Sequence, residues 1–226
     1  RFFKKYAQKY RAMLKYFTHF FVQNEESKEL LNTINLKNVT ITGDTRFDRV
    51  FEITQNAKTL TLVEEFNKDK LFTLIAGSTW KPDEEIIVEY VNNTKNSLKF
   101  IIAPHEIHKE NIIRLQKSFK QDIKVIKYSE ANEQNIGDAN VLIIDSIGLL
   151  SSLYKYGDVA YIGGGFGKGI HNTLEAATFG LPIIFGPNYL KFQEAVDIVS
   201  LGSAFSIKDY SCCKEILDDF INSEER

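Results

Sequence analysis

The chain has 226 residues, 43% hydrophobic and 26% charged, a composition typical of a folded globular protein. Its 28 basic and 30 acidic side chains give a net charge of -2 at pH 7, so it lacks the overall positive field that draws proteins to nucleic acid. No apolar run approaches the roughly 18 to 20 residues that a membrane-spanning helix needs, and the first residues lack the apolar segment of a secretory signal.

The start of the chain favours an amphipathic helix. Residues 1–23 place apolar side chains at helical spacing with lysine and arginine between them, at Phe3, Tyr6, Tyr10, Leu14, Phe17 and Phe21. Such a helix either lies on an anionic membrane surface or packs its stripe on a domain, and both interpretations stay open. Because the chain begins with Arg1 and not with methionine, we expect a fragment of a longer protein.

A domain boundary is predicted near residue 55. A short helix over 27–33 and a strand with a glycine turn over 38–50 precede it, and a polar helical stretch over 53–68 follows. We therefore expect residues 1–55 to be the remnant of one domain with its linker, and residues 56–226 to be a second domain.

The second domain alternates apolar strands with helices. Strands are predicted at 71–77, 98–104, 123–128, 140–145, 158–164, 181–186 and, briefly, 202–207. Helices are predicted at 83–96, 107–119, 148–156, 172–179, 192–200 and from 212 onward. Continuous apolar strands between helices indicate a doubly wound parallel sheet, an α/β fold of about six strands. All strand ends then meet at one edge, where such sheets bind ligands. Polar or small residues follow the strands directly at Gly77, Ser78, Pro104, His105, Asp145 and 163–165.

The segment "GGGFGKGIHNTLE" (163–175) carries the densest signal for a site. Glycines between a strand and a helix let backbone N–H groups approach a phosphate, although a tight turn without a ligand has the same composition. Asn172 is predicted to cap the helix, with Glu175 three residues later. Glu175 either closes a capping box or accepts the hydroxyls of a ribose. The glycine pattern matches neither the usual dinucleotide loop nor the P-loop.

Motifs for other chemistry are absent from the sequence. No D-x-D pair occurs, the four histidines lack H-x-x-x-H spacing, and His105 with His108 has no third ligand, so we expect no metal site. No G-x-S-x-G elbow indicates a hydrolase. Cys212 and Cys213 are adjacent, which suits neither a disulfide framework nor zinc, and we expect two inert thiols in a reducing, cytosolic compartment.

Taken together, the motifs resemble one family, the bacterial Kdo transferases, which transfer 3-deoxy-D-manno-octulosonic acid (Kdo) from CMP-Kdo to a lipid A precursor in lipopolysaccharide biosynthesis. The resemblance covers nearly the whole chain. It is carried by "TGDTRFDRV" (42–50), "IAGSTWKPDEE" (75–85), "IIAPHEI" (101–107), "DSIGLLSSLYKYGDVAYIGGGFGKGIHNTLEAATFGLPIIFGP" (145–187) and "KFQEA" (191–195).

The resemblance implies a GT-B glycosyltransferase, an inverting and metal-independent enzyme without a cofactor. The chain is then the C-terminal, Rossmann-like, nucleotide-sugar-binding half with the end of the N-terminal acceptor domain. The family's catalytic base lies in a region that this chain does not match, so no catalytic residue is named and the isolated chain is expected to be inactive. The residues implied to bind the nucleotide sugar are Arg46, Gly77, Ser78, Pro104, His105, Gly164, Gly165, Gly169, Asn172 and Glu175.

Three departures from the family affect the contacts to the sugar carboxylate. Many relatives have an Arg-His-Pro run where this chain has "PHEIH", a histidine at the position of Trp80, and a glycine at that of Ile170. Because the missing arginine removes a bidentate anion partner, we expect His105 or Lys168 to compensate.

The resemblance also implies a place in the cell, the cytoplasmic side of the bacterial inner membrane, with peripheral contact through residues 1–23. Two other interpretations stay open: a UDP-sugar transferase or UDP-N-acetylglucosamine epimerase-like enzyme, and an isolated, non-catalytic nucleotide-binding domain.

Overall fold

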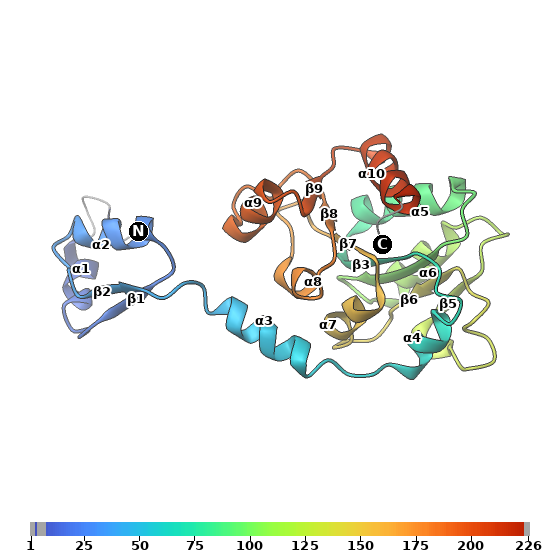
Figure 1. Cartoon of the computed structure of the whole chain (residues 1–226), viewed down its shortest axis with the longest axis horizontal. Helices are drawn as coiled ribbons and strands as arrows, with labels where there is room; N and C mark the ends of the chain where they lie inside the picture. Colours follow the sequence, from blue (N-terminus) through green and yellow to red (C-terminus); the bar gives the residue numbers. More distant parts are fainter. Residues whose placement is uncertain (1–2, 4–7, 224–226) are drawn as a thin grey trace. The chain divides into compact units, whose positions relative to one another are not determined.

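The computed structural model describes residue 3 and residues 8–223, and the chain forms two compact units, Arg1–Glu52 and Ile53–Arg226 (Figure 1). The first unit contains a two-stranded parallel sheet in which Phe20 pairs with Val39 and Val22 with Ile41. Its elements are α1 (Gln8–Leu14), β1 (Phe20–Val22), α2 (Glu25–Asn32) and β2 (Val39–Ile41), and α3 (Arg46–Gln55) crosses into the second unit.

The single helix predicted over residues 1–23 is wrong within the described residues. Helix α1 ends at Leu14, and Phe20–Val22 form strand β1. Aromatic and β-branched side chains favour a strand, and pairing with β2 supplies the backbone hydrogen bonds that a longer helix would have made internally. Part of the predicted helix falls on residues 1–2 and 4–7, which lie outside the described residues.

The predicted helix over 53–68 is interrupted. Helix α3 ends at Gln55, and α4 (Thr61–Phe66) begins after a gap of five residues. In the gap, the Lys58 N–H donates to the Ser152 hydroxyl at 3.1 Å and the Leu60 N–H to the Tyr156 hydroxyl at 2.8 Å. These side chains take the backbone donors that a continuous helix would use, so the chain runs extended here.

The second unit is built on one parallel sheet of seven strands in the order β5-β6-β4-β3-β7-β8-β9 (Figure 1). Its strands are β3 (Thr73–Thr79), β4 (Lys99–Pro104), β5 (Val125–Lys127), β6 (Val141–Ile143), β7 (Val159–Ile162), β8 (Ile183–Phe185) and β9 (Ala204–Ser206). Its helices are α4 (Thr61–Phe66), α5 (Lys81–Asn93), α6 (Lys109–Lys117), α7 (Leu150–Leu153), α8 (Leu174–Thr178), α9 (Gln193–Ser200) and α10 (Tyr210–Asn222), with 3-10 turns at Tyr128–Glu130 and Tyr154–Tyr156. The predicted doubly wound α/β fold is confirmed, with each strand within a few residues of its expected position.

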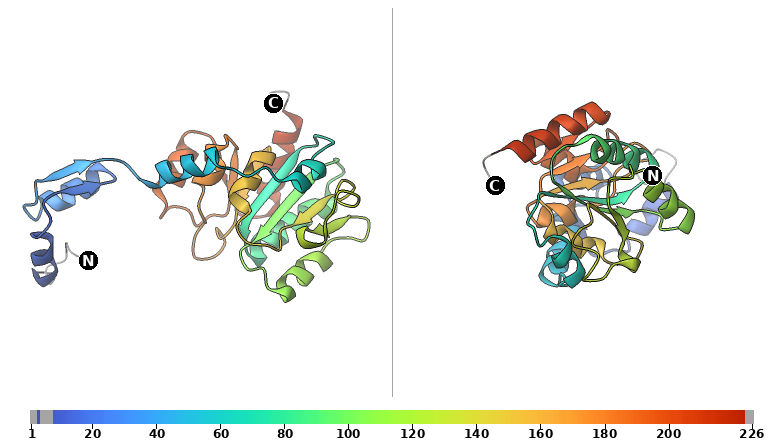
Figure 2. Two further views of the ribbon diagram at one scale, coloured as in Figure 1. Left: turned by 90° about the horizontal axis from the view of Figure 1, so that it is seen from below. Right: turned by 90° about the vertical axis from the view of Figure 1, so that its right-hand side faces the viewer.

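Helices cover both faces of this sheet, so each strand contributes to two hydrophobic cores (Figure 2). In β3, Leu74 and Ala76 pack with residues of α5, α6 and α10, whereas Ile75 packs on the opposite face with residues of α4 and α7. Side chains alternate across a strand, and burial on both faces accounts for the continuous apolar runs in the sequence.

Candidate functional site

The centre of the sheet is a topological switch point. Strands β3 and β7 are neighbours, but the chain continues from β3 to β4 on one side and from β7 to β8 on the other. Loops that leave such a pair in opposite directions open a crevice at the carboxyl ends of the strands, where doubly wound sheets bind ligands. The residues after β3 and those after β7 therefore form the walls of the candidate site.

The end of β3 has unusual backbone geometry. Ser78 has a φ of +53°, and the register between β3 and β4 shifts between Gly77 and Thr79. A non-glycine residue in the left-handed region costs about 1–3 kcal/mol and marks functional sites more often than other positions. The distortion turns the chain into α5, whose N-cap is Trp80.

Asp83, in the first turn of α5, joins this helix to the loop after β7. Only 1% of its surface is exposed. Its Oδ2 accepts the N–H groups of Trp80 and Gly164, both at 2.9 Å, and its Oδ1 accepts the Tyr161 hydroxyl at 3.0 Å. Burial raises the pKa of the Asp83 carboxyl, and the three hydrogen bonds oppose that effect.

The glycines of the loop after β7 are required by close backbone contacts. A Cβ at Gly163 would lie 2.2 Å from the Ser78 carbonyl oxygen, and one at Gly165 would lie 2.5 Å from the Gly186 nitrogen. Gly164 and Gly169 have φ values of +93° and +144°, which disfavour side chains. The loop thus fits between the end of β3 and the loop after β8.

Most of the glycine N–H groups predicted to approach a phosphate already have acceptors inside the protein. Gly163 donates to the Gly77 carbonyl at 2.9 Å, and Gly164 donates to Asp83. The N–H groups of Gly167 and Gly169 both donate to the Gly164 carbonyl, at 2.9 and 3.3 Å. A phosphate at this loop would therefore be held mainly by side chains and by the remaining amides.

Three aromatic rings lie together beside the loop. The His105 ring stacks on Trp80 with a centroid distance of 4.5 Å and on His171 with one of 4.4 Å. The Trp80 Nε1–H also donates to the His171 Nε2 at 3.1 Å. Burial, followed by the neighbouring His105 imidazole, lowers the pKa of His171, and the charge of Asp83 opposes this.

A cavity of about 490 Å³ lies between the first turn of α5 and the loop after β7. Its lining contains one basic side chain, Lys168, and one acidic one, Asp83, whose oxygens are taken up by the hydrogen bonds above. The lining residues are Trp80, Pro82, Asp83, Gly164, Phe166, Gly167, Lys168, Gly169 and His171. A cavity of this size, largely apolar and with few polar groups, is typical of a small-molecule site.

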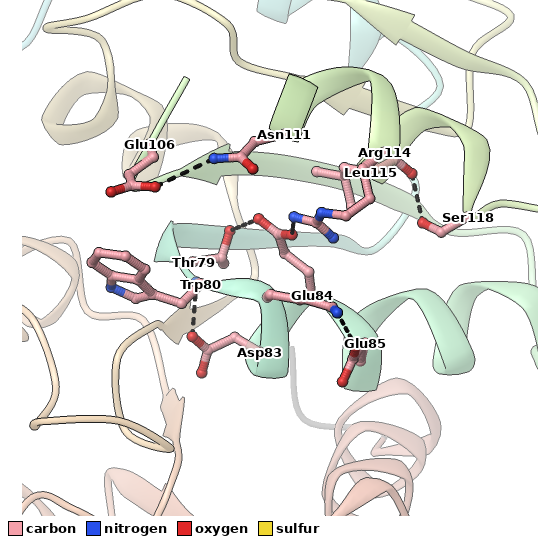
Figure 3. Close-up of polar contacts among 11 residues, drawn as sticks. Thr79, Trp80, Asp83, Glu84, Glu85, Glu106, Asn111, Arg114, Leu115 and Ser118 are labelled. Atoms are coloured by element: carbon pink, nitrogen blue, oxygen red, sulfur yellow. Dashed lines mark hydrogen bonds and ion pairs between the residues drawn. The ribbon is translucent and has the colours of Figure 1, made fainter. Parts of the chain in front are cut away.

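On the other side of Trp80, an ion pair between a partly exposed arginine and a buried glutamate joins α5 to α6 (Figure 3). Arg114 contacts the Glu84 carboxylate at 2.5 Å, and the Thr79 hydroxyl donates to the same carboxylate at 3.3 Å. Burial raises the pKa of Glu84, and Arg114 opposes that effect. The pair fixes the start of α5, and with it the placement of Trp80 and Asp83.

The structure brings only some of the predicted site residues to the cavity. Gly164 and Gly169 line it, and His105 stacks against two of its lining residues. Gly77 and Pro104 are buried in strands, and a Cβ at Gly77 would lie 2.2 Å from the Tyr154 hydroxyl, so packing alone accounts for that glycine.

The predicted helix cap at Asn172 has a different form. Helix α8 begins at Leu174, the Asn172 Oδ1 accepts the Leu174 N–H at 3.1 Å, and the Asn172 side-chain amide donates to Glu175 at 3.0 Å. Arg46 belongs to the first unit, where it forms an ion pair with Asp44 that lowers the pKa of that carboxyl. The roles predicted for these residues stay predictions.

The sequence analysis did not identify Asp83 as a site residue, and it mentioned His171 only as one of four histidines without metal-ligand spacing. Asp83 lies within the run "KPDEE", where helix-start acids are ordinary. What sets Asp83 apart is its hydrogen bond to Gly164, which is 81 positions away in the sequence. No local sequence pattern predicts such a contact. Within the described residues, no group of three or more His, Cys, Asp or Glu side chains could hold a metal ion.

Comparisons with known proteins give relatives along nearly the whole chain. No family model matches it. The 3-deoxy-D-manno-octulosonic acid transferase of Rickettsia bellii is 30% identical over 210 residues, which are 91% of this chain and 49% of the relative. The enzyme of the same name from Aquifex aeolicus is 28% identical over 204 residues, 88% of this chain and 52% of the relative. The chain thus spans about half the length of the curated relatives it matches.

A solved structure has the same fold. The C-terminal CMP-Kdo binding domain of WaaA from Acinetobacter baumannii superposes with a TM-score of 0.55 at 21% identity, over 77% of this chain and 86% of that domain. The predicted resemblance is therefore confirmed: the chain is similar in sequence to the Kdo transferases, and it has the Rossmann-like α/β fold of that CMP-Kdo binding domain.

Proposed function

We propose that this chain is the nucleotide-sugar-binding part of a glycosyltransferase that transfers Kdo from CMP-Kdo to a lipid A precursor. The observation that carries the proposal is the cavity between α5 and the loop after β7, because it lies at the switch point of a sheet whose relatives are Kdo transferases. Those relatives are about twice as long, so the catalytic base and most of the acceptor site are assigned to a part of the enzyme that this chain does not span.

The lining of the cavity supports a mechanism without a metal ion. A departing CMP carries negative charge, and Lys168 is exposed on the loop that lines the cavity. Glu175 is the second residue of α8, which follows the loop, and we assign its carboxylate to the ribose hydroxyls. Direct displacement at the sugar by the acceptor hydroxyl would invert the configuration of the anomeric carbon.

Calorimetric titration of the chain with CMP and with UMP, with and without magnesium, tests this proposal. We expect CMP to bind more tightly than UMP and magnesium to make no difference. Replacing Glu175 with alanine should weaken CMP binding by about tenfold, the value of one good hydrogen-bonded contact. The exposed Glu85 is a matched control, and Glu85→Ala should bind as the wild type does. A preference for UMP would indicate a UDP-sugar enzyme instead, and binding of neither nucleotide would contradict the proposal.

Lys168 is proposed to contact the sugar carboxylate or the phosphate, in place of the arginine that many relatives carry. Lys168→Ala should weaken CMP-Kdo binding by about tenfold, because a charge-assisted hydrogen bond is worth about 1.5–3 kcal/mol. The exposed Lys191 serves as the matched control. Unchanged affinity in Lys168→Ala would remove this residue from the site.

We also propose peripheral contact with the anionic inner membrane through residues 1–23. Three aromatic side chains after α1 are unusually exposed: Tyr16 (88%), Phe17 (58%) and Phe21 (70%). Aromatic side chains next to basic ones favour the interface of an anionic bilayer, where each lysine adds roughly 1 kcal/mol. No helix among the described residues is long and apolar enough to cross a membrane.

Flotation with vesicles that contain anionic lipid tests this contact. Replacing Tyr16, Phe17 and Phe21 with serine should reduce the floated fraction, and so should replacing Lys4, Lys5 and Lys9 with glutamate. Vesicles of neutral lipid are the control for charge. Flotation that neither set of substitutions changes would contradict the membrane proposal.

A further inference from the structure

The loop after β7 is held at both ends by one turn of helix α5. We name it the 164–171 loop. Its first residue, Gly164, donates its N–H to Asp83 at 2.9 Å, and its last residue, His171, accepts the indole N–H of Trp80 at 3.1 Å. Trp80 is the N-cap of α5 and Asp83 its third residue, so two side chains three positions apart hold both ends of the loop.

The Trp80 contact determines the proton position on His171. The indole nitrogen is a donor only, so the Nε2 of His171 must accept with a lone pair. A neutral imidazole that accepts at Nε2 carries its proton at Nδ1. If His171 became protonated, both ring nitrogens would carry hydrogens and the indole N–H would face another donor, so the hydrogen bond would be lost.

The surroundings of His171 favour the neutral ring. His105, which follows β4, stacks on it at 4.4 Å, so a second positive charge there would be repelled. Asp83 of α5 is the acidic group that acts on it, and this carboxylate is occupied by three hydrogen bonds. Burial and His105 together lower the pKa of His171 more than Asp83 raises it.

We propose that Trp80 is a positioning residue whose indole N–H holds neutral His171, and with it the end of the 164–171 loop, in the form that binds a nucleotide. Trp80 and His171 both line the cavity, so loss of their hydrogen bond changes the wall that the ligand contacts. Binding should therefore weaken on acidification as His171 takes up a proton. This inference rests on the proposed function, because the occupant is taken to be a nucleotide.

Nuclear magnetic resonance of the ligand-free chain tests the hydrogen bond itself. Long-range proton–nitrogen spectra of the ¹⁵N-histidine-labelled protein should show His171 protonated at Nδ1 and not at Nε2, and titrating below the ordinary pKa of 6.5. In Trp80→Phe, which keeps an aromatic ring to stack on His105 but loses the donor, the His171 pKa should rise. Protonation at Nε2 in the wild type, or an unchanged titration in Trp80→Phe, would overturn the proposal.

Titration with CMP between pH 5 and pH 8 tests the consequence for binding. Wild-type affinity should fall as the pH drops through the His171 titration. Trp80→Phe should bind CMP about threefold to tenfold more weakly at pH 7.5, and its loss of affinity should begin at a higher pH. In His171→Gln, the amide oxygen can accept the indole N–H but does not titrate, so affinity should follow pH only through the phosphate of CMP, whose second pKa is about 6. His108→Gln, which alters an exposed histidine outside the cavity, should keep the wild-type pH profile.

The outcomes separate this inference from the proposed function. Wild-type CMP binding that does not depend on pH and is unchanged in Trp80→Phe would overturn the positioning role and leave the nucleotide site intact. Absence of CMP binding by the wild type at every pH would overturn the nucleotide site, while the magnetic resonance titration would still decide whether Trp80 holds neutral His171. Circular dichroism of each variant shows whether the fold is kept.

Discussion

Asp83 is the residue with the largest structural consequence at the site. Its carboxylate accepts two backbone N–H groups and one hydroxyl between α5 and the loop after β7, and the contacts to Tyr161 and Gly164 are buried. A buried donor left without an acceptor costs about 1–3 kcal/mol. Removing this single side chain therefore leaves three donors unpaired at once, although water can reach some of them through the adjacent cavity.

We expect Asp83→Ala to lower the free energy of unfolding by about 2–4 kcal/mol, measured by urea denaturation followed by circular dichroism. Glu85→Ala is the control, because Glu85 is exposed and its contact to Lys81 is a surface pair at 3.7 Å. Its effect should stay below about 0.5 kcal/mol. An equal decrease in the free energy of unfolding in the two variants would show that the Asp83 hydrogen bonds contribute no more to stability than a surface ion pair does.

The two adjacent cysteines have different environments. Cys213, on the buried face of α10, is 0% exposed, and burial raises its pKa to about 12, whereas Cys212 is partly exposed. We expect a thiol reagent at pH 8 to modify Cys212 in the native protein and Cys213 only after unfolding. Cys212→Ser should then show almost no native reactivity. Rapid modification of both thiols in the folded chain would contradict the buried position of Cys213.

At the level of elements, the contact between the end of β3 and the loop after β7 depends on Gly163. A Cβ at this position would meet the backbone of Ser78 at 2.2 Å, and backbone atoms cannot turn aside as a flexible side chain does. We expect Gly163→Ala to destabilise the protein by about 2–3 kcal/mol, seen as a lower melting temperature.

Gly167, in the same loop, gives the matched comparison. A Cβ there would come no closer than 3.6 Å to another heavy atom, which is ordinary van der Waals contact. Gly167→Ala should therefore change the melting temperature little. A Gly163→Ala protein as stable as Gly167→Ala would show that the strand end and the loop can separate at low cost.

The strands of the second unit could be predicted from the sequence because strands that are buried on both faces consist of continuous apolar residues. The elements that were predicted wrongly depend on contacts between residues that are distant in the sequence. Phe20–Val22 became a strand through pairing with Val39–Ile41, and the side chains of Ser152 and Tyr156 interrupted the helix expected over 53–68. The same holds for the site. The run "GGGFGKG" predicted the loop, but its partner Asp83 could not be predicted because acidic residues are common at the start of any helix.

For the whole molecule, the two units differ in how much they bury. Among the described residues of the first unit, only Leu31 and Val50 are buried hydrophobic residues, whereas the second unit has two extensive cores. Hydrophobic burial is the main favourable term in folding, so the first unit has little buried apolar surface to stabilise it.

We expect the amides of β1 and β2 to exchange with deuterium much faster than those of β3, β4 and β7, measured by hydrogen exchange with mass spectrometry. Local opening is cheapest where few apolar contacts must be broken. The central strands of the second unit provide the internal control in the same sample. Equal protection in both units would mean that the first unit is stabilised by contacts other than buried apolar side chains.

The two-stranded sheet of the first unit leaves open backbone edges. Within the described residues no third strand pairs with β1 or β2, so their outer N–H and C=O groups are available to another chain. Phe21, 70% exposed on β1, adds an apolar contact for an incoming strand. The chain should therefore self-associate as its concentration rises, which sedimentation velocity would detect, and Phe21→Lys should reduce this, because a charge on an edge strand discourages strand addition. A strand from a second copy of the chain would pair these groups, so the small sheet would be completed by association and not by its own strands.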